Sequence, residues 1–254
     1  MSATIRFTAV TAVTAAVLSA LATAPSVASA APSFRMTPVA GHQLAGHHLI
    51  GGIRNSTSSN WAGYSATGGT FTSVSASWVQ PAVSCTSSTT YSSFWIGIDG
   101  DGSDSVEQTG TEADCYGGSP EYSSWYEMYP AYPVNYSNTV SPGDHFTSTV
   151  SASGSTFTLT LSDTTRGWTK TTTKTSSTAE LASAEIIAEA PSSSTGVLPL
   201  SNFGTASFTN SKANGQAIGN YSPDAITMAS GSTTKATTSA LSSGTNFSVT
   251  WKHK

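Results

Sequence analysis

Short runs of apolar and aromatic residues, separated by Gly, Pro, Asn or Ser, recur along the chain from about residue 70 onward. The pattern is clearest where Phe157, Leu159 and Leu161 interleave with Thr158 and Thr160, which predicts a strand with one buried and one solvated face. We expect strands at 70–79, 94–98, 122–129, 144–151, 156–162, 184–189, 206–210 and 246–251. Many short strands with frequent turn residues indicate an all-β domain, either two packed antiparallel sheets or a barrel.

The stretch 177–190 has the strongest helical character in the chain. It begins with a suitable capping residue, but it contains Ile186 and Ile187 and stops at Pro191, so we expect its second half to be a strand. Within that strand, Glu185 and Glu189 share a face only if the strand is regular. A bulge, or the turn at Pro191, would separate them.

The N-terminal segment has the pattern of a signal peptide. Arg6 precedes an uncharged apolar run at about 7–22, and small residues at 28–30 follow in the A-x-A pattern. We therefore expect a signal peptide over 1–30, a secreted extracellular protein and no membrane anchor.

The next segment, 31–56, contains Arg35 and Arg54, no acidic residue and three of the five histidines. This segment is either a basic leader that docks on the following domain or a solvated linker. We expect the folded domain to follow it, at 57–254.

The rest of the chain is acidic. From residue 56 onward there are 14 acidic residues against 7 Lys and Arg, a net charge of −7, and the first acid is Asp99. The two cysteines, Cys85 and Cys115, are an even number in a secreted chain, so we expect them to form a disulfide worth ~3 kcal/mol.

The sequence lacks the residues and motifs of several common kinds of catalysis. Only His145 and His253 follow the leader, and neither has the setting of a catalytic base for a Ser or Cys nucleophile. No G-x-S-x-G or H-E-x-x-H motif, phosphate-binding glycine loop or basic aromatic patch is present, so we expect no cofactor, no metal and no nucleic-acid partner. Asp99, Asp101 and Asp104 resemble a calcium loop but lack its downstream Glu. Carboxylate and amide chemistry remain.

Six motifs in order resemble those of the glutamic peptidases (eqolisins), known best from fungi. They are N-W-A-G at 60–63, W-I-G-I-D-G at 95–100, Q-T-G at 108–110, W-Y-E-M-Y-P at 125–130, A-E-I-I-A-E at 184–189 and F-G-T-A-S-F-T-N at 203–210. The resemblance implies a concanavalin A-like, lectin-like β-sandwich of two antiparallel sheets of about seven strands each. It also implies hydrolysis of protein and peptide substrates at acid pH, insensitive to pepstatin, by a monomer.

Carried over position by position, the resemblance assigns the catalytic pair to Gln108 and Glu189. It places Trp61, Trp95, Asp99, Glu127 and Tyr129 along a substrate groove. For the two tryptophans a plain core role is nearly as good an interpretation.

This chain departs from the family at Met128 and Ile186, where Trp is usual, so we expect a more open groove. A short loop before Trp95 predicts a single chain rather than two.

Two other functions fit a β-sandwich. Glu127 and Glu189 are a candidate acid and nucleophile pair for a glycoside hydrolase. A non-catalytic lectin-like, carbohydrate-binding module is the third hypothesis. Gln108 distinguishes the peptidase hypothesis from these two alternatives, because neither a glycoside hydrolase nor a binding module requires a side-chain amide at this position.

Overall fold

The computed structural model describes residues 48–50, 53–193 and 196–254. The expected signal peptide and residues 31–47 of the expected leader lie outside these ranges. The described residues contain no α-helix and a single 3-10 helix, Ile218–Tyr221. None of their helical segments is long and apolar enough to cross a membrane.

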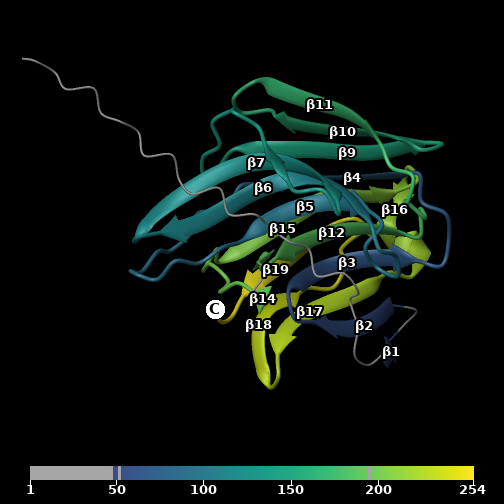
Figure 1. Ribbon diagram of the computed structural model, residues 1–254. Coiled ribbons are helices and arrows are strands. Elements are labelled where there is room, and N and C mark those ends of the chain that lie inside the picture. Colours follow the sequence, from purple (N-terminus) through teal and green to yellow (C-terminus); the bar gives the residue numbers. More distant parts are fainter. Residues whose placement is uncertain (1–47, 51–52, 194–195) are drawn as a thin grey trace, which may run out of the picture. The chain divides into compact units, whose positions relative to one another are not determined.

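The described strands form two sheets (Figure 1), and the first is the sheet that carries the candidate catalytic residues. Its strands lie in the order β1 (His48–Ile50), β2 (Ile53–Ser58), β17 (Asp224–Ser230), β3 (Trp61–Thr67), β12 (Ser183–Glu189), β5 (Ser93–Ile98), β6 (Val106–Tyr116), β7 (Ser119–Tyr129) and β8 (Val134–Asn135). Apart from the short β1 and β8, this sheet has the expected seven strands.

The second sheet also has seven strands in the described residues. Their order is β18 (Thr233–Thr238), β19 (Phe247–Trp251), β15 (Thr205–Ala213), β4 (Ser73–Val79), β9 (His145–Ser153), β10 (Thr156–Asp163) and β11 (Trp168–Thr175). Strand β17 pairs with β3 and with β18, so the hydrogen-bonded ladder passes from one sheet to the other. Short strands β13 (Ser192–Ser193) and β14 (Gly196–Val197) form a separate pair, and β16 (Gln216–Ala217) extends β15.

Alternate residues of both sheets fill the core between them. Phe94, Ile96 and Ile98 of β5 lie in it, beside every second residue of β12. From the second sheet, the Trp78 indole N–H donates to the Thr111 hydroxyl of β6 at 3.0 Å. The predicted antiparallel β-sandwich is therefore confirmed, and so is the predicted strand over the second half of 177–190.

One strand pair departs from the antiparallel pattern. Strand β2 runs parallel to β17, with Arg54 opposite Asp224 and Ser58 opposite Met228. Ser56 and Ser58 are buried. The expected domain boundary after residue 56 therefore falls inside a strand of the sheet.

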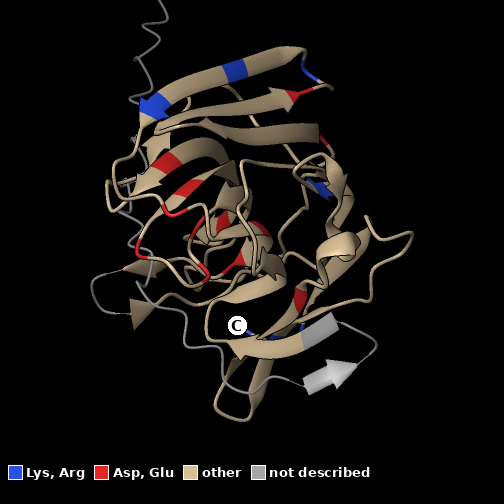
Figure 2. Cartoon of the chain, turned by 90° about the vertical axis from the view of Figure 1, so that its right-hand side faces the viewer, with Lys and Arg blue, Asp and Glu red and all other residues tan. Residues whose placement is uncertain are grey.

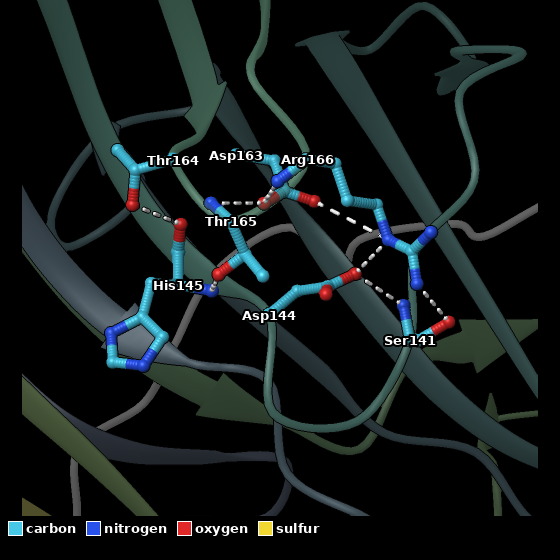
Figure 3. Close-up of polar contacts among 7 residues, drawn as sticks. All are labelled: Ser141, Asp144, His145, Asp163, Thr164, Thr165 and Arg166. Carbon is cyan, nitrogen blue, oxygen red and sulfur yellow. Dashed lines mark hydrogen bonds and ion pairs between the residues drawn. The ribbon is translucent and has the colours of Figure 1, made fainter.

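Two covalent or ionic contacts secure connections at the ends of strands. The predicted disulfide joins Cys85 to Cys115, near the end of β6, with Cα atoms 5.4 Å apart. At the β10–β11 turn, Arg166 forms an ion pair with Asp144 and lies 3.9 Å from Asp163 (Figure 3). In the same view the exposed imidazole of His145 makes none of the drawn contacts, in agreement with a surface role.

Candidate active site

The outer face of the first sheet, which points away from the second sheet, is organised in three rows across neighbouring strands. One row contains Glu127, Gln108, Gly97, Glu185 and Ser65. The middle row contains Trp125, Gly110, Trp95, Ile187, Gly63 and Ile226. The third contains Ser123, Glu112, Ser93, Glu189 and Trp61. Strand β12 is regular, so Glu185 and Glu189 share this face. The pairing of β5 with β6 places Gln108 on the same face.

The middle row is apolar and separates the two candidate catalytic residues. Trp61, Trp95, Trp125, Ile187 and their neighbours form a cluster distinct from the core between the sheets. Trp61 packs edge-on to Trp95 with ring centroids 5.0 Å apart. A Cβ at Gly110 would lie 2.6 Å from the Trp95 Cβ and would collide with a backbone carbonyl of β5, so only glycine fits opposite this tryptophan.

Gln108 is tied to Glu127 on the next strand. Its side-chain Nε2 donates to Glu127 Oε2 at 2.6 Å. Both side chains are 2% exposed. Within the described residues, Gln108 Oε1 and Glu127 Oε1 are buried without a hydrogen-bond partner. Two oxygens at this point of the face thus have hydrogen-bonding capacity that the described residues do not use.

Glu189 receives a donor on each carboxyl oxygen. The Trp95 indole N–H donates to Oε2 at 2.7 Å, and the Asn60 side-chain amide donates to Oε1 at 3.1 Å. The side chain is 7% exposed, the most of the three polar groups Gln108, Glu127 and Glu189. Tyr129 packs against the apolar cluster between these polar groups.

A family model, described as the peptidase A4 family, matches residues 59–251. The chain belongs to the peptidase A4 family. Two solved structures of glutamic peptidases are also similar to this chain. A crystal structure of scytalido-glutamic peptidase with a transition-state analog inhibitor is 27% identical, covers 76% of this chain and 98% of its own, and has a TM-score of 0.67. Aspergilloglutamic peptidase from Aspergillus niger is 28% identical, covers 64% and 99%, and has a TM-score of 0.56. No individually curated protein matches the sequence.

The chain is therefore a glutamic peptidase, a hydrolase, as its motifs predicted. This result sets aside the glycoside hydrolase and the lectin-like module. In this peptidase the acidic positions gather on neighbouring strands in the middle of the view in Figure 2, while several of the basic ones follow the strand at its upper edge. Among the residues that the structure describes, no group of three His, Cys, Asp or Glu side chains is arranged to hold a metal ion.

Burial dominates the electrostatics of the peptidase site. It raises the pKa of Glu189 to about 7, although N–H donors from Trp95, Trp61 and Asn60 lower it, and the nearby Glu112 adds a smaller increase. Burial also raises the pKa of Glu127 well above its usual value, followed by the charge of Glu189, while the Gln108 amide lowers it. The carboxyl groups of Glu127 and Glu189 are thus close enough to interact, and Glu189 is largely protonated in acid. The hydrogen bonds that Glu189 receives therefore do not offset its desolvation.

Asp99 has a different environment from the other expected groove residues. It is fully buried after β5, and its carboxylate accepts backbone N–H groups from Glu180, Leu181 and Ala182 at 2.7 to 3.0 Å. These hydrogen bonds fix the segment that leads into β12, so the Asp99 carboxylate stabilises this loop and is not directed to the outer face. We therefore do not include Asp99 among the proposed substrate contacts.

Sequence reasoning also missed two members of the site. Trp125 lies in the middle row, and its indole N–H is buried without a hydrogen-bond partner in the described residues. Asn60 lies in the first motif but was given no role. The alternation of Trp125, Glu127 and Tyr129 along one strand was the available signal for Trp125. For Asn60 the chain offered none, because its contact with Glu189 spans 129 positions.

Proposed function

We propose that this peptidase is a secreted endopeptidase that acts at acid pH and hydrolyses peptide bonds with water activated between Gln108 and Glu189, without a covalent intermediate. The observation that supports it is the placement of both side chains on one face of one sheet, around a shared tryptophan, with Gln108 Oε1 free of protein partners in the described residues.

In the proposed reaction, Gln108 orients the water through Oε1 and donates its second amide hydrogen to the developing oxyanion. Glu189 begins in its protonated form, because its pKa is about 7. It donates its proton to the scissile carbonyl oxygen while its other oxygen takes a proton from the attacking water. It then protonates the departing amine as the C–N bond breaks and takes a proton from one hydroxyl of the new acid, so the products are one carboxylic acid and one amine and Glu189 is again protonated.

The related structures support peptides as substrates. One glutamic peptidase was solved with a peptide-based transition-state analog, and the eqolisin SCP-B was solved with the tripeptide Ala-Ile-His. We propose that a peptide lies across the same face here, against Trp61, Trp95, Glu127 and Tyr129. The signal peptide expected at 1–30 supports secretion.

Cleavage of denatured casein between about pH 2 and pH 8 tests the proposal. Glu189→Gln and Gln108→Ala should each lose nearly all activity and remain folded, whereas the matched surface variants Glu180→Gln and Gln216→Ala should keep it. Wild-type activity should decline as the pH rises through about 7, where Glu189 loses its proton. Full activity of Glu189→Gln, or inhibition by pepstatin, a chelator or a serine reagent, would contradict the mechanism.

A further inference from the structure

The turn between β2 and β3 places a buried amide against Glu189. Asn60 is 1% exposed, and its Nδ2 donates to Glu189 Oε1 at 3.1 Å. The other oxygen of Glu189 is held by the Trp95 indole. With Asn60 on one oxygen and Trp95 on the other, the plane of the carboxyl group is fixed from two sides, and the Trp61 side chain adds a further hydrogen bond to the group.

Ser58 determines which way the Asn60 amide points. Its hydroxyl donates to Asn60 Oδ1 at 3.2 Å. Ser58 Oγ in turn accepts the backbone N–H groups of Asn60 at 3.3 Å and of Trp61 at 3.1 Å. With Oδ1 engaged by this hydroxyl, the amide presents Nδ2 to Glu189. The reversed amide would face a carboxyl oxygen with an oxygen and would leave the Ser58 hydroxyl against an NH₂ group.

We propose that Asn60, oriented by Ser58, is a positioning residue for Glu189. This inference rests on the proposed catalytic role of Glu189. Asn60 acts through the carboxyl group and not on the substrate. It holds Oε1 in place while Oε2 is held by Trp95, so that the lone pairs used for proton transfer keep a constant direction.

The donor is neutral, so its effect on the carboxyl group persists across the working pH range. The other titratable groups that influence Glu189 are Glu112 on β6 and Glu127 on β7. A hydrogen bond from Asn60 favours the ionised carboxyl and lowers its pKa, in opposition to burial and to Glu112. Loss of the amide should therefore make Glu189 harder to ionise, a change that disturbed packing alone would not single out.

The contact also links the site to the segment that precedes the family match. Ser58 is the last residue of β2, whose parallel pairing with β17 holds it, and the matched region begins at residue 59. Removing Ser58 with the leader would leave the Asn60 amide without its orienting hydroxyl. We therefore place any maturation cut that keeps activity on the N-terminal side of Ser58.

A direct titration of the Glu189 carboxyl carbon by ¹³C NMR tests the proposal, with the signal assigned through Glu189→Gln. In Asn60→Ala the titration midpoint should rise by about one pH unit, since hydrogen bonds to charged groups are worth one to two such units. The value of kcat should fall about 10- to 100-fold with KM nearly unchanged. Ser58→Ala should shift both in the same direction by less, and Ser58→Thr, which keeps the hydroxyl, should restore them.

Asn220→Ala, at an exposed asparagine of the 3-10 helix, is the matched control and should change neither quantity. If Asn60→Ala does not fold, Ser58→Ala supplies the same test. An unchanged Glu189 midpoint in a folded Asn60→Ala or Ser58→Ala variant overturns the proposal. Because the titration reads the carboxyl group itself, it decides this point whether or not casein is cleaved, and a wild-type protein without cleavage would instead refute the proposed function.

Discussion

Raising the pH should unfold this domain, because it buries carboxyl groups that prefer to be protonated. Glu107 is fully buried at the start of β6, and burial raises its pKa to about 7, with hydrogen bonds from Ser176 and Ser105 lowering it. From the ordinary value of 4.5, this difference corresponds to about 3 kcal/mol of stability. Because the folded state holds the proton more tightly, that stability is fully present below about pH 4.5 and is lost as the pH rises through about 7.

Other carboxyl groups act in the same direction. The pKa of Glu189 is raised to about 7, which adds a second contribution of about 3 kcal/mol, and burial also raises the pKa of Glu185 well above its usual value. Together these groups approach the whole free energy of unfolding of a typical domain, about 5–15 kcal/mol. The fold is therefore expected to be far more stable at pH 4 than at pH 8.

Urea unfolding, followed by tryptophan fluorescence at several values between about pH 4 and pH 8, measures this loss. The Glu189→Gln variant is a suitable parent, because it should not digest itself. Adding Glu107→Gln should flatten the decline by about 3 kcal/mol, whereas Glu180→Gln, at an exposed side chain, should not change it. An unfolding free energy that stays constant or increases from pH 5 to pH 8 would refute this reasoning, as would an unchanged slope in the double variant.

Two further variants test the construction of the sheet. Gly110→Ala should destabilise the domain by roughly 1–3 kcal/mol and reduce kcat/KM, because the new methyl group would displace Trp95. Thermal melting and steady-state kinetics measure the two effects. Gly69→Ala is the control, because its methyl group would meet the nearest ring carbon at 3.7 Å, an ordinary contact distance. Replacing Cys85 and Cys115 with serine should lower the free energy of unfolding by about 3 kcal/mol in urea titrations, and an unchanged midpoint would show that the disulfide contributes little.

Sequence alternation located several of the strands that have one solvated face, although it missed β17. Strand β10, with Phe157, Leu159 and Leu161 directed to the core, was found almost at its true ends. Strand β6 was missed because it is buried on both faces over much of its length and carries polar residues on both, with Glu107 and Thr109 on one side and Gln108 on the other. Such a strand shows no apolar period. The edge strand β11 was missed for the opposite reason, since its Thr and Lys side chains are mostly exposed.

The candidate site was found through motif resemblance, and its geometry required long-range pairing. The regularity of β12, which places Glu185 and Glu189 on one face, is set by continuous pairing with β3 and β5, and neither partner is adjacent in sequence. The register also puts Glu185, not Glu189, in the row of Gln108. The sequence gives no reason to prefer one of these glutamates on position alone. The two side chains differ in environment, because Glu185 is fully buried while Glu189 keeps some exposure and accepts hydrogen bonds from Asn60 and Trp95, and this difference supports the proposed role of Glu189.

Stability and the proposed chemistry of this domain depend on the same physical property, the desolvation of buried carboxyl groups. Sequestering Glu189 among tryptophans removes water from its carboxyl group, which raises its pKa and keeps it protonated in acid. The same desolvation at Glu107 and Glu185 makes the fold prefer acid. A fold that tolerated neutral pH would need hydrogen-bond donors or cations beside each of these carboxyl groups. Beside Glu189, such groups would stabilise the ionised carboxylate and reduce the capacity of Glu189 to donate a proton in acid. The hydrogen bonds that Glu189 does receive come from neutral groups, which position the carboxyl group without adding a positive charge.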